Sequence, residues 1–163
     1  LSGTVTTLAA SLMAPVVYDL GTGGRGGPLG LGPDAAALAG ASPDGSLTGW
    51  PWMWLVTGFL AAYFVGAVPY VKTMVRQRGD RGMIVGSVGL HTALMAAALG
   101  CTADGLLSWA HALVWVLLAL RATVLPLIQL RRMRSGQPLI SVRLVGRLEM
   151  IVSLLVLLSL LLG

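Results

Sequence analysis

Long runs of apolar residues, separated by shorter polar segments, dominate this sequence. The runs are continuously apolar and lack the alternation of membrane β-strands, so they predict helices. A helix needs about 20 mostly apolar residues to cross a bilayer. Runs that reach or nearly reach this length occupy residues 1–18, 50–71, 82–101, 106–128 and 144–163. The pattern predicts an all-α fold, a polytopic transmembrane helix bundle with about five membrane helices in a single membrane domain, 1–163.

The segments between these helices differ in composition. Residues 19–49 are rich in Gly and Pro, which predicts a flexible outer loop. Residues 102–105 are short enough to form a tight turn. Residues 72–81 and 129–143 are basic, and both follow an apolar run.

The distribution of charge predicts an orientation in the membrane, because Lys and Arg collect in cytoplasmic loops. Most of the basic residues lie in or beside the two basic segments: Lys72, Arg76, Arg78, Arg81, Arg131, Arg132, Arg134, Arg143 and Arg147. Four acidic residues lie in the other two loops: Asp19, Asp34, Asp44 and Asp104. We therefore expect a multi-pass protein of the plasma membrane, with loops 72–81 and 129–143 in the cytoplasm and the C-terminus outside.

Composition narrows the class of protein. Of the 163 residues, 56% are apolar and 10% are charged, whereas a soluble domain carries roughly a quarter charged residues. This balance excludes a soluble enzyme domain, a nucleic-acid-binding module and a disordered tail, since a small domain leaves much of its surface in water. The net charge of +5 is then explained by topology and not by nucleic acid. The chain starts at Leu1 within an apolar run, so we expect further membrane helices before it.

Two charged residues within the predicted helices lie at matching depths. Arg121 is about 10 Å, and Glu149 about 7–8 Å, from the cytoplasmic end of its helix at 1.5 Å per residue. They can pair if the two helices are neighbours, and Ser153 shares the helix face of Glu149 together with Gly146. The pair is interpreted either as a site for a charged substrate or proton, or as a structural ion pair between two helices. In another structural alternative, Glu149 caps a cluster of neighbouring arginines.

His91 lies in the middle of helix 82–101. Ser87 precedes it by one helical turn and is placed to form a hydrogen bond with it. A seam of small residues runs along the opposite face of the helix, at Gly82, Gly86, Gly89, Ala93, Ala97 and Gly100. We therefore expect this helix to be central and packed on both sides, with His91 either a neutral bridge between helices or part of a polar site.

His111 lies close to Trp109 and Trp115, which predicts an interfacial position in an aromatic belt. Its height differs from that of His91 by roughly 7 Å, which argues against a haem held by the two histidines. Motifs for nucleotide, zinc and dithiol chemistry are absent from the sequence, as are paired aspartate motifs for metal-diphosphate chemistry. We expect no metal and no cofactor.

Several short motifs, in order along the chain, are similar to those of bacterial YwiC-like membrane proteins. Residues 70–79, YVKTMVRQRG, resemble that family's YVKTMIRERG stretch. The other matching positions are His91, Arg121-Ala122 with Pro126, Gly146 with Glu149, and the opening helix from Leu1 to Asp19. The resemblance, best to actinobacterial members, covers nearly all of the chain except the Gly-rich loop. It implies the C-terminal part of a longer integral membrane protein of the bacterial inner membrane, and it assigns no biochemical activity.

Three hypotheses about function remain open at this point. The first is a YwiC-like protein with an intramembrane polar ligand or transport site. The second is a membrane-embedded enzyme that modifies a lipid or isoprenoid, and the third is a membrane scaffold without a site. The candidate polar site consists of His91, Arg121, Glu149, Ser87 and Ser153. Anionic lipid headgroups are expected at the cytoplasmic face, against Lys72, Arg76, Arg78, Arg131, Arg132 and Arg134.

Overall fold

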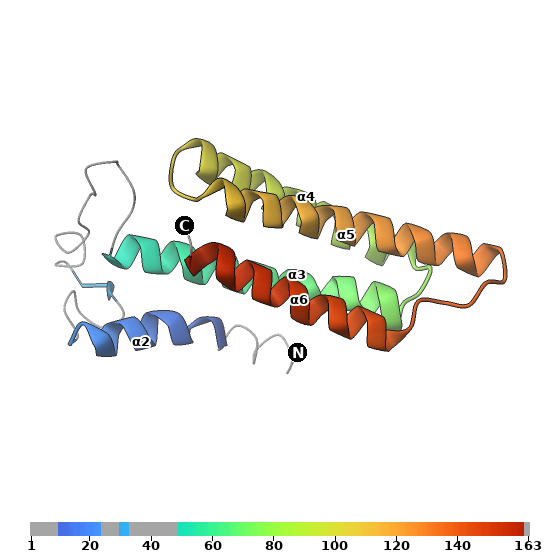
Figure 1. The fold of residues 1–163 in the computed structure, drawn as a ribbon, viewed down its shortest axis with the longest axis horizontal. Helices are drawn as coiled ribbons and strands as arrows, with labels where there is room; N and C mark the ends of the chain where they lie inside the picture. Colours follow the sequence, from blue (N-terminus) through green and yellow to red (C-terminus); the bar gives the residue numbers. More distant parts are fainter. Residues whose placement is uncertain (1–9, 24–29, 33–48, 162–163) are drawn as a thin grey trace. The chain divides into compact units, whose positions relative to one another are not determined.

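The computed structural model describes residues 10–23, 30–32 and 49–161. This part of the chain contains the helices α2 (Met13–Gly21), α3 (Gly49–Val75), α4 (Arg81–Ala103), α5 (Trp109–Arg134) and α6 (Val142–Leu161), and it contains no strand (Figure 1). The predicted all-α fold is confirmed. Three of these helices, α3, α4 and α5, are long and apolar enough to cross a membrane.

The first nine residues of the predicted membrane helix 1–18, and most of the predicted loop 19–49, fall outside the described residues. Where the structure does describe this region, α2 continues to Gly21, so the helix extends past the expected start of the loop. The last predicted membrane helix corresponds to α6, and whether α6 crosses the membrane stays a prediction.

The basic segments are more helical than the sequence pattern predicts. Lys72 lies in the last turn of α3, and the arginines from Arg131 to Arg134 lie in the last turn of α5. Each helix therefore continues past its apolar run. Basic side chains are favourable at a helix C-terminus because they interact with its exposed carbonyl groups and with the helix dipole.

Short polar caps begin the helices of the second half of the chain. The Asp80 carboxylate accepts a hydrogen bond from the Met83 amide (3.2 Å) and caps α4. The Ser108 hydroxyl accepts from the His111 amide (3.3 Å) and caps α5. Gly105 adopts a φ of 74° in the turn between the two helices, a conformation that glycine adopts without steric cost. These residues give α4 and α5 a tight connection.

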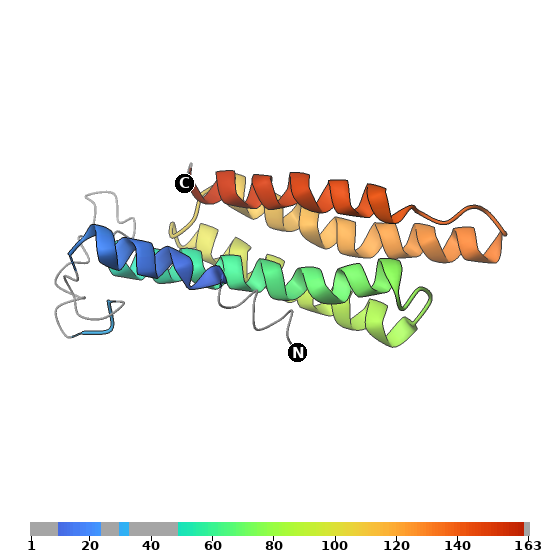
Figure 2. The same ribbon diagram turned by 90° about the horizontal axis from the view of Figure 1, so that it is seen from below.

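The described chain divides into two compact units, residues 1–65 and 66–163, and α3 contributes to both. In the first unit the ring of Tyr18 packs edge-on against Trp50, with ring centroids 4.9 Å apart. In the second unit α5 packs against both α4 and α6 (Figures 1 and 2). The α4–α5 turn and the end of α6 lie at one end of this unit (Figure 2).

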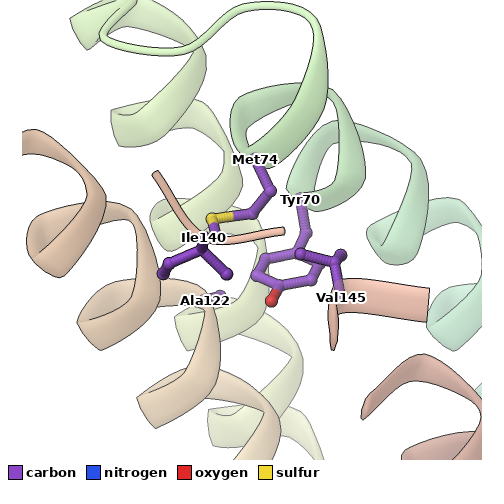
Figure 3. Close-up of a cluster of buried hydrophobic side chains, with 5 residues drawn as sticks. All are labelled: Tyr70, Met74, Ala122, Ile140 and Val145. Carbon is purple, nitrogen blue, oxygen red and sulfur yellow. The ribbon is translucent and has the colours of Figure 1, made fainter. Parts of the chain in front are cut away.

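An apolar cluster holds the other end of the second unit together. It consists of Tyr70, Met74, Ala122, Ile140 and Val145, from α3, α5, α6 and the α5–α6 connection (Figure 3). Gln129 of α5, itself buried, fixes this connection because its side-chain oxygen accepts a hydrogen bond from the amide of Ile140 (3.0 Å). A Cβ atom added to Gly79 would lie 3.4 Å from the Met133 side chain, so the α3–α4 connection reaches the end of α5. Both basic segments therefore lie at the same end of the second unit.

The outer faces of α5 and α6 are apolar. Exposed residues on α5 include Leu113, Leu117, Leu120, Val124 and Leu127, and those on α6 include Met150, Ile151, Leu154 and Leu158. Soluble monomers rarely expose apolar patches of this extent. These faces fit contact with lipid.

Candidate functional site

Arg121 and Glu149 form an ion pair between α5 and α6. The Nη1 group of Arg121 donates a hydrogen bond to Oε1 of Glu149. Their side chains are only 8% and 18% exposed. The pairing predicted from their matching depths is confirmed. The pair joins two helices whose outer faces are apolar.

Tyr70 of α3 lies against the guanidinium group of Arg121. The Cζ atom of Arg121 is 4.1 Å from the centroid of the Tyr70 ring, which is a cation–π contact. Tyr70 is fully buried. The residue pattern did not assign Tyr70 to the site. The sequence shows only a tyrosine near the basic end of a predicted helix. Its contact with Arg121 depends on where α3 packs, which the sequence pattern does not give.

His91 of α4 also packs against Tyr70, in a T-shaped arrangement with ring centroids 6.4 Å apart. Its Nδ1 atom is 2.8 Å from the backbone carbonyl oxygen of Ser87. Because a carbonyl can only accept, Nδ1 carries the proton and Nε2 is an acceptor. The predicted hydrogen bond between Ser87 and His91 is therefore present, and its acceptor is the backbone carbonyl oxygen of Ser87. The Cε1–Nε2 edge of the ring faces α3, where a Cβ atom added to Gly66 would lie 3.5 Å from Nε2.

Several polar atoms of this cluster are buried without a hydrogen-bond partner in the described part of the chain. They are the Tyr70 hydroxyl, the Ser87 hydroxyl, and Nε and Nη2 of Arg121. Leaving a buried donor unsatisfied costs about 1–3 kcal/mol, and more for a charged group. Native structures contain few such groups, and each calls for a physical reason. We refer to Tyr70, Ser87, His91, Arg121 and Glu149 as the polar cluster.

Ser153 forms a hydrogen bond within α6. Its hydroxyl donates to the backbone carbonyl oxygen of Glu149 (2.7 Å), one turn earlier. Gly146, on the same face, is exposed, and a Cβ atom there would meet nothing within 4 Å in the described chain. The expected close packing along this face is therefore not present among the described residues.

The small-residue seam of α4 is also exposed. Added Cβ atoms at Gly86, Gly89 and Gly100 would meet nothing within 4 Å in the described chain. The buried positions of α4 lie on the face that carries Ser87 and His91. The expectation that this helix packs on both sides is thus wrong for the described residues, because α5 and the end of α3 cover only the His91 face.

His111 is fully buried among the described helices, so its side chain does not lie on the outer surface with Trp109. Its Nε2 atom accepts a hydrogen bond from the Trp115 indole (2.8 Å), and its Nδ1 atom bonds to the Ser159 hydroxyl of α6 (2.8 Å). Trp109, by contrast, is 67% exposed. These bonds make His111 a bridge between α5 and α6 with both ring nitrogens occupied, in keeping with a structural role.

The six basic residues expected at anionic lipid fall into two groups. Arg78 and Arg132 are half-buried and donate to the backbone carbonyl oxygens of Met74 (2.8 Å) and Pro138 (3.2 Å). The exposed group is Lys72, Arg76, Arg131 and Arg134. Only the exposed side chains extend freely from the end of the second unit.

No group of three or more His, Cys, Asp or Glu side chains that could hold a metal ion occurs among the described residues. The chemistry that the polar cluster offers is hydrogen bonding and charge. It combines the paired guanidinium of Arg121, the hydroxyl groups of Tyr70 and Ser87, and the imidazole of His91 as an acceptor. These groups are carried by a helical unit whose outer faces are apolar.

Comparison of the chain with protein-family models, with curated proteins and with solved structures finds no match.

Proposed function

We propose that this chain is part of a multi-pass bacterial inner-membrane protein of the YwiC-like type, and that its polar cluster is an intramembrane site for a ligand or transported solute. The observation that carries the proposal is the set of buried donors on Tyr70, Ser87 and Arg121 that lack a partner in the described chain. A structural ion pair needs only Arg121 and Glu149. It gives no reason for the unsatisfied donors around it, whereas a polar ligand would satisfy them.

A thermal-unfolding screen of the purified full chain in detergent tests this proposal. The panel contains neutral, cationic and anionic solutes, and a bound solute stabilises by about 2.7 kcal/mol at a concentration 100 times its Kd. The matched control is the Arg121→Leu/Glu149→Leu double variant, which removes both charges together. We expect a solute that raises the midpoint of the wild type but not that of the double variant. A panel without any such solute would support the scaffold alternative.

The proposed orientation places both basic segments in the cytoplasm. Their location at one end of the second unit supports it, as does the positive-inside distribution of charge. In a Cys101→Ser background, a membrane-impermeant thiol reagent applied to intact cells should label a cysteine at Leu31 and spare one at Gln77. Both side chains are exposed. The opposite labelling pattern would reverse the topology.

We further propose that the four exposed basic residues at this end bind anionic lipid headgroups. Each basic residue near an anionic surface contributes about 1 kcal/mol. Lys72→Gln/Arg76→Gln/Arg134→Gln should therefore retain less phosphatidylglycerol through detergent purification than the wild type, as counted by mass spectrometry. Arg78→Gln/Arg132→Gln is the matched control, because these side chains bond to the backbone. Equal retention in the triple variant and the wild type would leave the basic residues a role in topology alone.

A further inference from the structure

We infer that one edge of the Arg121 guanidinium, formed by Nε and Nη2, binds a carboxylate or phosphoryl group on the ligand of the polar cluster. This inference rests on the proposed function, since it names the chemistry of that ligand. The guanidinium group of Arg121 carries five N–H donors, and its contacts leave some of them without a partner in the described chain.

The ion pair with Glu149 uses Nη1. The Nε–H group and one N–H of Nη2 point in the same direction along a different edge of the planar group. Two parallel donors of this kind match the two oxygens of a carboxylate or phosphoryl group, and this match underlies bidentate recognition by arginine. In the described chain neither of these two nitrogens has a hydrogen-bond partner, and both are buried.

The remaining contacts hold the guanidinium in place without using this edge. The Tyr70 ring covers one face at 4.1 Å, and Glu149 holds the Nη1 end. The side chain is 8% exposed, so solvent screens its charge weakly. A preorganised donor pair in a poorly solvated setting binds an oxyanion more strongly than an arginine on the surface does.

Glu149 sets the strength of this binding. Its carboxylate neutralises Arg121 and repels a second anion, so the pair limits the affinity for an oxyanion. Removing the charge of Glu149 should therefore strengthen oxyanion binding. Replacing Arg121 with lysine keeps a cation that can pair with Glu149 and removes the parallel donors. The two substitutions thus have opposite expected effects.

The test measures thermal unfolding of the full chain in detergent with sodium acetate, sodium phosphate or added short-chain phosphatidylglycerol. Sodium chloride at equal ionic strength is the reference. In the wild type, at least one of these oxyanions should raise the thermal midpoint above the value in chloride. The compound that does so shows whether the ligand group is a carboxylate, a free phosphate or a lipid headgroup. Arg121→Lys should weaken that binding by about tenfold or more, as expected for loss of a charge-assisted donor pair. Glu149→Gln should strengthen it.

Two results would overturn the inference. One is equal stabilisation of the wild type and Arg121→Lys by the same oxyanion. The other is an absence of stabilisation by every oxyanion in both the wild type and Glu149→Gln, and this second variant keeps the test valid if Arg121→Lys fails to fold. If a neutral or cationic solute still stabilises the wild type and not the double leucine variant, the proposed site stands and only its ligand class is wrong. If no solute of any class does so, the proposed function fails as well.

Discussion

Replacing Arg121 and Glu149 with leucine, singly and together, measures how strongly the ion pair couples α5 to α6. Glu149→Leu leaves a guanidinium that is 8% exposed and cannot lose its proton. Breaking a buried pair in this way costs about 3–5 kcal/mol, and we expect a value near the upper limit. Arg121→Leu leaves a carboxyl group that is 18% exposed and can take up a proton, so its cost should lie near the lower limit of that range.

The double variant removes both charges and strands neither. It loses the cation–π contact with Tyr70, worth about 0.5–2 kcal/mol. Well-packed apolar residues in place of a buried pair are often neutral or stabilising. The double variant should therefore unfold within about 2 kcal/mol of the wild type. The sum of the single losses should then exceed the double loss by at least about 4 kcal/mol.

Unfolding by SDS in mixed micelles, followed by tryptophan fluorescence, provides the assay. Trp115 is fully buried, and its indole bonds to His111, which in turn bonds to Ser159 of α6. Separation of α5 from α6 should therefore change the tryptophan emission of the chain. Single losses that add to the double loss within about 0.5 kcal/mol would refute the reasoning, because residues that do not interact behave additively. Such a result would mean that α5 and α6 do not meet through this pair.

Two further predictions concern packing elsewhere in the chain. Gly30→Ala should destabilise the first unit more than Gly23→Ala. Both glycines have positive φ, 67° and 66°, but of the two only Gly30 would place its new Cβ against the Trp50 ring, inside van der Waals contact. Equal thermal midpoints for the two variants would contradict this. His111→Leu should cost about 1–3 kcal/mol in the SDS assay because it removes the acceptor of the Trp115 indole, and an unchanged midpoint would show that this bond does not stabilise the second unit.

The apolar pattern was sufficient to predict the helices and one long-range contact. Length and hydropathy located α3, α4 and α5 because membrane helices must be apolar over a fixed distance. The pairing of Arg121 with Glu149 followed from two depths and a short connection, which together leave few alternatives. Helix ends were predicted less accurately, since α5 continues to Arg134 whereas the apolar run ends at residue 128.

The remaining parts of the site depend on tertiary packing that no local pattern encodes. Tyr70 reaches Arg121 only because the end of α3 packs beside α5. His111 bonds to Ser159 of α6, which is far away along the chain, so its place in the fold depends on how α6 packs against α5. The small-residue seam of α4 differs from these two contacts. Its sequence pattern predicts close helix packing, but no helix packs against it among the described residues. The sequence therefore supplied candidates, and the fold decided which of them meet.

The proposed site is tested most directly by the signal of one side chain. In the full chain labelled with ¹⁵N-arginine and held in micelles, the Nε–H resonance of Arg121 is identified by its loss in the Arg121→Lys variant. We predict that this resonance shifts on addition of the solute that raises the thermal midpoint and stays in place when sodium chloride is added at equal ionic strength. A rise in midpoint with an unchanged Arg121 signal would show that the solute binds elsewhere and that the polar cluster is not its site.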